Sequence, residues 1–232
     1  MSEQWERVFT QLNPKSPIAE AFRVLRTNIQ FAGVDKPLKA ISLTSAGPGE
    51  GKTTTLANLA VALAQSGAKV ILVDGDLRRP AMHKFFRLSR RTGLSSVIMG
   101  RAKPAEALQA TDVPGLSLLS SGPVPPNPSE LLGSEAFTAL LGELKASADH
   151  VLVDSPPVVA VADASIIAAK VDGTLLVVRL GATARPMALR AREQLVTAKA
   201  NLLGMVLTDV GAGTDYNYYY HYYYHYRDSR EG

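Results

Sequence analysis

The fold is decided by residues 39–58, KAISLTSAGPGEGKTTTLAN. This stretch opens with an apolar run typical of a strand, passes through a glycine-rich turn, and continues as a predicted helix that begins at Lys52. Backbone N–H groups can surround a polyphosphate only where small residues let the main chain come close, and the N-terminus of the next helix adds a favourable dipole. The stretch therefore predicts a strand, a phosphate-binding loop and a helix, and with them nucleotide binding.

Individual roles follow from the positions within this loop. We expect Lys52 to reach the β- and γ-phosphates and Thr53 to bind Mg²⁺. The usual pattern of such loops starts with glycine, where this chain has Ala46, which is nearly as small. The competing interpretation is a glycine-rich turn beside a helix whose lysine is merely solvated. The predicted nucleotide-binding residues are Gly47, Pro48, Gly49, Glu50, Gly51, Lys52, Thr53 and Thr54.

Composition limits the classes of protein that this chain can belong to. Its 232 residues are 46% apolar, which is ample for the core of one large domain and argues against a second independent domain. It has no secretory signal and no apolar run near the roughly 20 residues that span a bilayer, so we expect a soluble, cytoplasmic protein. The lack of cysteine excludes disulfides, thiolate catalysis and cysteine-bound zinc. Six basic residues between Arg78 and Arg91 form either a patch for phosphate, anionic lipid or an acidic partner, or a solvated surface.

Apolar strand-like runs alternate with helical segments along the rest of the chain. The runs at 69–73, 116–119, 151–153, 174–178 and 203–207 are the predicted strands, and one helix is expected from near Ser129 to at least Leu144. This alternation predicts an α/β fold of the P-loop NTPase class, with a mostly parallel sheet flanked by helices on both faces. The predicted domain covers residues 16–210, between an N-terminal segment, 1–15, and a flexible tail, 211–232.

Three aspartates follow predicted strands directly: Asp74, Asp76 and Asp154. Ligands of such sheets bind at the carboxyl ends of the strands, so these carboxylates should meet the phosphates there. Clustered carboxylates repel one another unless a cation lies among them, and Mg²⁺ prefers oxygen ligands. The alternative for each is an aspartate that only caps a helix or turn. The predicted metal ligands are Thr53, Asp74 and Asp154, and the predicted catalytic residues are Lys52, Asp74, Asp76 and Asp154, with Asp76 as the expected base.

Residues 16–31 are predicted to form a helix, with Ser16 as its N-cap and Pro17 in its first turn. One stripe of apolar positions should pack on the domain: Ile18, Phe22, Leu25 and Ile29. Three charged residues should face outward on the other side: Glu20, Arg23 and Arg26. Spacing alone favours an ordinary surface ion pair for these charges.

All eight tyrosines lie in the last 17 residues, and none occurs in the 215 residues before them. Core aromatics would be spread over several elements, so this segment should be a mobile tail rather than part of the fold. A phosphoacceptor cluster is the favoured interpretation. The alternatives are a stacking platform for single-stranded nucleic acid and a metal-binding tract through His221 and His225. The predicted phosphoacceptors are Tyr216, Tyr218, Tyr219, Tyr220, Tyr222, Tyr223, Tyr224 and Tyr226.

Taken together, these motifs resemble the bacterial tyrosine autokinases (BY-kinases) of capsule and exopolysaccharide systems. The resemblance rests on AGPGEGKTT, ILVDGDLRRP, HVLVDSPP, PPNPSELL and the tyrosine cluster, and it spans nearly the whole chain. Glu20, Arg23 and Arg26 are similar to the family's E-x-x-R-x-x-R oligomerisation motif, which favours an oligomerisation role for helix 16–31. Relatives often carry asparagine after the last strand, near the adenine base, where this chain has Thr208 and Asp209.

The resemblance implies a protein-tyrosine autokinase that uses ATP and Mg²⁺ and regulates polysaccharide synthesis and export. Neighbouring subunits of a ring would phosphorylate each other's tails. A membrane-embedded polysaccharide co-polymerase would activate the kinase and recruit it to the inner face of the cell membrane. The main rival is a ParA/MinD-like switch ATPase, which usually has a second lysine where this chain has Gly47. A nucleic-acid-binding switch that uses the basic segment is disfavoured.

Overall fold

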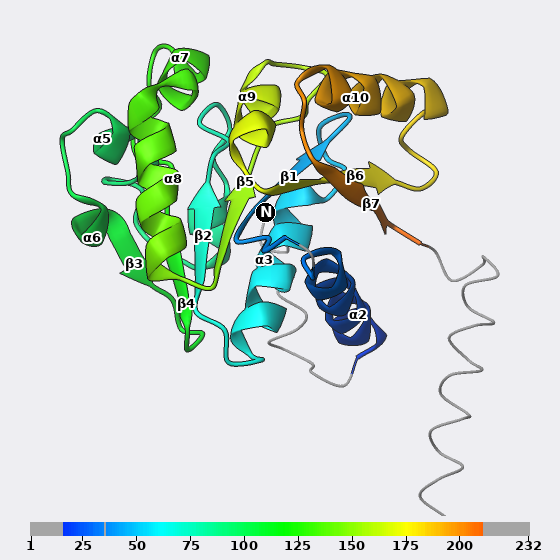
Figure 1. Ribbon diagram of the computed structural model, residues 1–232, viewed down its shortest axis with the longest axis horizontal. Helices are drawn as coiled ribbons and strands as arrows, with labels where there is room; N and C mark the ends of the chain where they lie inside the picture. The colour runs from blue at the N-terminus through cyan, green and yellow to red at the C-terminus, as the bar shows by residue number, and fades with distance from the viewer. Residues whose placement is uncertain (1–15, 35, 211–232) are drawn as a thin grey trace, which may run out of the picture.

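The computed structural model describes residues 16–34 and 36–210. The predicted N-terminal segment and the predicted tail, with every predicted phosphoacceptor tyrosine, lie outside the described residues. The described chain is built on one sheet with the strand order β3-β4-β2-β5-β1-β6-β7 (Figure 1). In chain order the strands are β1 (Ala40–Ser45), β2 (Val70–Asp74), β3 (Leu108–Ala110), β4 (Leu116–Leu119), β5 (His150–Asp154), β6 (Gly173–Arg179) and β7 (Leu202–Thr208).

The sheet is mostly parallel, as predicted. Strand β1 lies between β5 and β6, and only the pair β3 and β4 is antiparallel among the described strands. Strand β2 pairs with β5 in a register that places Asp74 opposite Asp154. Strand β3 has no counterpart among the predicted strands, because its three residues contain no apolar run. The carboxyl ends of β1, β2 and β5 therefore meet at one edge, where the predicted site residues follow them.

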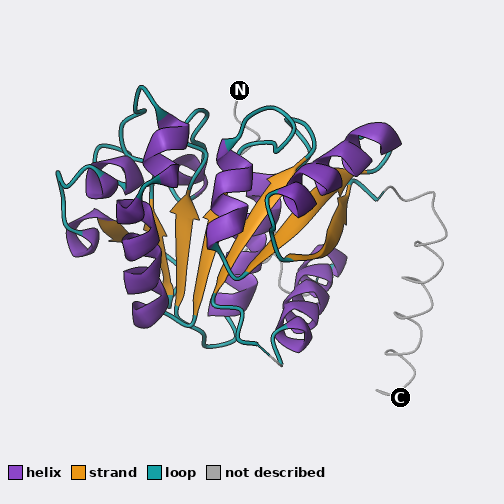
Figure 2. Cartoon of the chain, turned by 45° about the horizontal axis from the view of Figure 1, so that its top comes forward, coloured by secondary structure: helices purple, strands orange, loops and turns teal. Residues whose placement is uncertain are grey.

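Helices cover both faces of the sheet, which confirms the expected layering (Figures 1 and 2). Strand residues alternate between the faces: Leu72 packs in the cluster with α3, whereas Val73 packs in the cluster with α8. Helices α2 and α3 therefore cover one face, and α8, α9 and α10 cover the other. The helices are α2 (Pro17–Ala32), α3 (Lys52–Ala64), α4 (Met82–Phe85), α5 (Leu94–Ile98), α6 (Pro104–Ala107), α7 (Pro128–Gly133), α8 (Glu135–Ser147), α9 (Asp163–Lys170) and α10 (Arg185–Thr197).

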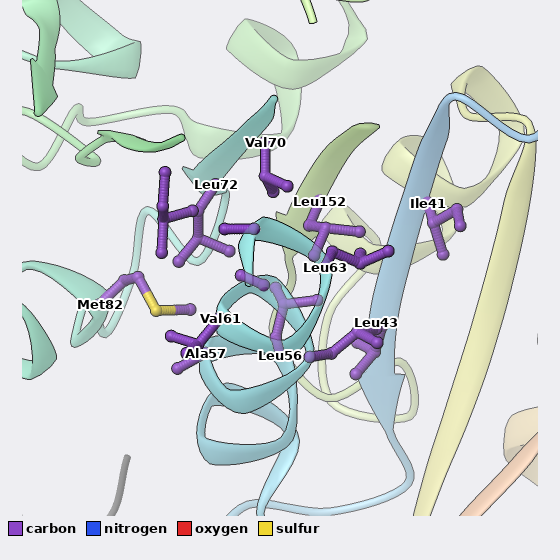
Figure 3. Close-up of a cluster of buried hydrophobic side chains, with 14 of the residues drawn as sticks. Ile41, Leu43, Leu56, Ala57, Val61, Leu63, Val70, Leu72, Met82 and Leu152 are labelled. Carbon is purple, nitrogen blue, oxygen red and sulfur yellow. The ribbon is translucent and has the colours of Figure 1, made fainter. Parts of the chain in front are cut away.

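Helix α3, which follows the phosphate-binding loop, lies deep in the structure. Every residue from Thr55 to Ala64 is buried, as expected of a helix that is apolar on most of its surface. Figure 3 shows Leu56 and Leu63 of this helix beside Leu43 and Leu152 of the sheet. This packing fixes the helix, so that its N-terminus is held at the edge of the sheet where the loop ends.

Helix α2 begins as predicted, because Ser16 Oγ accepts a hydrogen bond from the N–H of Ala19 at 3.1 Å. Its expected apolar stripe is only partly right. Ile29 is buried, but Ile18 is 43% exposed. The helix packs with the side that carries Ala19, which is 2% exposed, and Ile18 is rotated about 100° away from that side.

The outward orientation predicted for Arg26 is wrong. Its Nη1 donates to the carbonyl oxygen of Ala62 at 3.2 Å, in the last turn of α3. Carbonyl groups in a last turn lack helical partners and attract cations, which explains why the guanidinium turns inward. Glu20 and Arg23 do face outward, and Arg23 Nη1 lies 2.6 Å from Glu20 Oε2.

The single helix expected after Ser129 is divided in two. Helix α7 ends at Gly133, and Ser134 takes an extended conformation with φ −66° and ψ 157°, outside the helical region. Ser134 Oγ then accepts the N–H of Phe137 and so caps α8. The apolar pattern continues across the break, which is why periodicity alone did not reveal it.

Candidate active site at the carboxyl edge of the sheet

The phosphate-binding loop connects β1 to α3 and is braced by one of its own side chains. Glu50 is 7% exposed, and its carboxylate accepts the N–H groups of Ala46 at 3.1 Å and Gly47 at 3.0 Å. Gly49 and Gly51 have φ values of 75° and 90°, in the region that favours glycine. The loop is therefore held in a curled conformation by its own side chain and glycines. Its Glu50 carboxylate is used by the loop itself.

Four predicted site residues meet beside this loop. Lys52 Nζ lies 3.3 Å from Asp76 Oδ2 and 3.6 Å from Asp154 Oδ1. Thr53 Oγ1 donates to Asp154 Oδ2 at 2.7 Å. These residues come from the start of α3, the loop after β2 and the end of β5, as the strand-end argument predicted. The Lys52 ammonium group, which can bind phosphate, therefore lies next to oxygen atoms that can bind a metal.

Asp74 lies behind these residues, at the end of β2. It is fully buried, and its Oδ2 accepts the N–H of Met82 at 3.1 Å. Burial, followed by the nearby Asp154 carboxylate, raises the pKa of Asp74 to about 8. Burial also raises the pKa of Asp154, although Lys52 and Thr53 act against this. The pKa of Lys52 is raised because the attraction of Asp154 and Asp76 outweighs its burial. The cluster thus holds more carboxyl groups than its single lysine can balance, and Asp74 keeps its proton near neutral pH.

Two buried carboxylate oxygens without hydrogen-bond partners are consistent with a cation between the ends of β2 and β5. Asp74 Oδ1 and Asp154 Oδ1 have no hydrogen-bond partner among the described residues. Buried oxygens of this kind need an explanation, and a bound ion is one. No group of three or more His, Asp or Glu side chains in the described part of the chain could hold a metal alone. The residues fit Mg²⁺, which usually takes one or two carboxylates and completes its shell with phosphate and water.

Gly75 was not singled out by the sequence, although it lies between two predicted site residues. A Cβ atom at this position would lie 2.5 Å from the carbonyl oxygen of Asp154, closer than side chains can approach. Only glycine therefore lets β2 and β5 lie side by side at the point where Asp74 and Asp154 project. The sequence signal is the glycine between two aspartates after an apolar run.

Two further residues contact the loop from β6 and β7. Arg179 Nη2 lies 2.8 Å from Asp209 Oδ2, and Arg179 Nη1 lies 3.5 Å from the carbonyl oxygen of Gly49. Thr208 Oγ1 donates to the carbonyl oxygen of Glu50 at 2.8 Å. The last described strand therefore ends against the phosphate-binding loop. Arg179 could have been found by the strand-end argument that identified the aspartates, since it ends an apolar strand.

Comparison with known proteins gives a consistent result. A family model described as an AAA domain matches residues 38–198. Tyrosine-protein kinase YwqD of Bacillus subtilis (strain 168) is 44% identical over 220 residues, which cover 94% of this chain and 93% of that protein. The crystal structure of the chimerical protein CapA2B2 has a TM-score of 0.84 at 40% identity, and the match covers 87% of this chain and 89% of that one.

A second group of solved structures is similar at lower identity. The septum site-determining protein MinD from Pyrococcus horikoshii OT3, solved with Mg-ADP, has a TM-score of 0.65 at 27% identity. That match covers 75% of this chain and 72% of the MinD chain. YwqD and CapA2B2 are thus the more similar, both in identity and in the share of the chain that is matched.

Proposed function

This chain belongs to the family of bacterial tyrosine-protein kinases, and on that premise we propose that it transfers the γ-phosphoryl group of MgATP to the tyrosines of its own C-terminal tail. It is a tyrosine kinase with a P-loop domain, and it uses ATP and Mg²⁺. One observation supports the proposed chemistry most directly. Lys52, Thr53 and Asp154 come together at the edge of the sheet, next to the loop against which the last strand ends.

In the proposed mechanism, the loop amides and Lys52 hold the β- and γ-phosphates. Positioning and neutralisation of charge provide most of the catalysis in phosphoryl transfer. Thr53, Asp154 and Asp74 would hold Mg²⁺, which would neutralise charge on the phosphates. In the structure, Lys52 is paired with Asp76. When Lys52 turns to the phosphates, it releases the Asp76 carboxylate, which then accepts the proton of a phenol whose ordinary pKa is about 10.

The acceptor tyrosines are Tyr216 to Tyr226, and the tail that carries them follows the strand that contacts the loop. Tyr216 lies 7 residues after Asp209 in the chain. The segment between them can therefore extend at most roughly 23 Å, at about 3.3 Å per residue. Reach therefore permits transfer within one subunit as well as between subunits. Transfer between subunits is the proposal, because α2 has a surface suited to association.

That surface combines charge with exposed apolar side chains. Glu20 and Arg23 form an exposed ion pair. Two large apolar side chains on the same side of the helix are also exposed: Val24 at 52% and Phe31 at 72%. We assign α2 to homo-oligomer contacts, in a ring. Arg26 contributes indirectly, by holding α2 on α3 through the carbonyl group of Ala62.

A membrane partner completes the proposal. None of the described helices is both long and apolar enough to cross a bilayer. In the proposal, a polysaccharide co-polymerase recruits the chain to the inner face of the cell membrane and also activates the kinase. The process served would be the synthesis and export of capsule or exopolysaccharide, as the resemblance implies.

A mixing experiment tests transfer between subunits. A Lys52→Met protein with an intact tail is incubated with MgATP and an active protein cut after residue 210. Phosphate should appear on the tail tyrosines of the Lys52→Met protein, because it cannot label itself. If that protein stays unlabelled while the uncut wild type labels its own tail, transfer occurs within one subunit. If neither labels and ATP is still hydrolysed, the switch ATPase is the better description.

A further inference from the structure

The loop after β2, which carries Asp76, is tied to the rest of the protein by the side chain of Arg78. Arg78 Nε donates to Asp163 Oδ2 at 2.9 Å, and Nη2 donates to Asp163 Oδ1 at 3.0 Å. The same Nη2 donates to Ser129 Oγ at 3.1 Å, and this hydroxyl donates to Asp163 Oδ1 at 2.6 Å. Arg78 thereby links three separate elements: its own loop, α7 and α9.

The partner of Arg78 is a buried charge. The side chain of Asp163 is fully inaccessible to solvent, although it begins α9. A buried carboxylate is costly unless its oxygens are paired and hydrogen-bonded. Burial alone would raise the pKa of Asp163, but the hydrogen bonds from Arg78 and Ser129 outweigh it and hold the pKa below its usual range. Both oxygens of Asp163 are therefore committed to holding Arg78 in a two-point grip that a lysine could not reproduce.

The position of Arg78 affects Asp76 through the backbone of the loop. The N–H of Arg79, the residue after Arg78, donates to Asp76 Oδ1 at 2.9 Å. That bond leaves Asp76 Oδ2 directed at Lys52 Nζ, 3.3 Å away. Leu77, the residue between Asp76 and Arg78, is fully buried. The loop is therefore fixed at two successive residues, by the packing of Leu77 and by the hydrogen bonds of Arg78. The orientation of the Asp76 carboxylate thus depends on where Arg78 is held.

We propose that Arg78 is a positioning residue for phosphoryl transfer. By binding Asp163 and Ser129, it holds the loop so that the Asp76 carboxylate faces Lys52. Arg78 makes no described contact with Lys52, Thr53 or Asp154, so its effect passes through Asp76. This inference rests on the proposed function and adds to it a residue that acts from outside the phosphate and metal site.

The test compares Arg78→Gln with Arg79→Gln in the full-length protein. Arg79 is a matched control, since it lies on the same loop, is exposed, and gives Asp76 only its backbone N–H, which the substitution keeps. Two quantities are measured: the rate of tail phosphorylation at saturating MgATP, and the Kd of a fluorescent ATP analogue. Arg78→Gln should lower the rate by about 10- to 100-fold, the effect expected of a catalytic group displaced by a fraction of an ångström to 1 Å. Its nucleotide Kd should stay close to that of the control, because the phosphate-binding loop is untouched.

A double-variant cycle separates positioning from general destabilisation. In an Asp76→Asn background, Arg78→Gln should cause no further loss of rate, since the group that it positions is already disabled. A further loss of the same size in that background would overturn the proposal, as would a rate for Arg78→Gln equal to that of the control. If Arg78→Gln fails to fold, Arg78→Lys and Ser129→Ala replace it. Each is measured alone and in the Asp76→Asn background, and the same two outcomes decide the proposal. A wild type that labels no tyrosine would instead refute the proposed function.

Discussion

Replacing Asp74 by asparagine should stabilise the nucleotide-free protein, and the gain should grow as the pH rises. Asp74 is fully buried, and its pKa is raised from 3.8 to about 8 in the folded protein. Between these two values the unfolded chain releases this proton while the folded protein keeps it. Stability therefore falls with rising pH across that interval, and it levels off above about pH 8, where both states are ionised.

The size of the effect follows from the same shift. Each pH unit within the interval costs about 1.4 kcal/mol of folding free energy. At pH 6, about two units above the unfolded value of 3.8, Asp74 should cost on the order of 3 kcal/mol. An asparagine at this position keeps an oxygen that can accept the N–H of Met82 and carries no charge. The variant should therefore recover most of this cost.

Denaturant unfolding followed by circular dichroism measures this directly. The wild type and Asp74→Asn are compared in EDTA from pH 5 to pH 8, with Asp112→Asn as the control at an exposed aspartate. The stability gap between the wild type and Asp74→Asn should widen with pH, while the control should follow the wild type. A gap that is constant or shrinks as the pH rises would refute the electrostatic account. A magnesium site that includes Asp74 adds a second signature, because MgADP should then stabilise the wild type more than the variant.

Four other substitutions test separate parts of the structure. Glu50→Ala should raise the KM for ATP roughly tenfold, because two charge-assisted hydrogen bonds that curl the loop are lost; an unchanged KM would contradict the bracing role. Gly75→Ala should lower both the unfolding temperature and the rate of autophosphorylation, since its Cβ would lie 2.5 Å from a backbone oxygen; wild-type values for both would show that the strands can separate. Arg26→Ala should cost roughly 1–2 kcal/mol of stability, as its hydrogen bond to α3 is partly buried. Arg23→Ala should cost under about 0.5 kcal/mol but weaken association in light scattering, and the reverse ranking would refute these assignments.

Much of the fold could be predicted because its signals are local. The loop around Lys52 combines a strand, a glycine-rich turn and a helix within 20 residues, and the apolar runs show the other parallel strands. Strand β3 could not be predicted, since it is short and half-exposed and is defined only by its pairing with β4. The break between α7 and α8 lies within a continuous apolar pattern, so its only signal is Gly133 followed by Ser134.

The candidate site divides in the same way. Asp74, Asp76 and Asp154 could be predicted because parallel strands end at one edge, so that position along a strand determines position in the site. The link from Arg78 to Asp163 could not be predicted, because 85 residues separate the two in the chain. Helical period identifies which residues share a face of α2, but the packing of α2 on α3 decided that Arg26 turns inward and Ile18 outward.

In the proposed reaction, one edge of the sheet brings the terminal phosphate of MgATP to the tyrosines of the tail. The most direct measurement is intact mass followed by peptide mapping, after incubation with MgATP in the presence of the proposed membrane activator. The wild type should gain phosphate on tyrosines between Tyr216 and Tyr226, and Lys52→Met should gain none. Consumption of ATP by the wild type without phosphate on any tyrosine would contradict the claim.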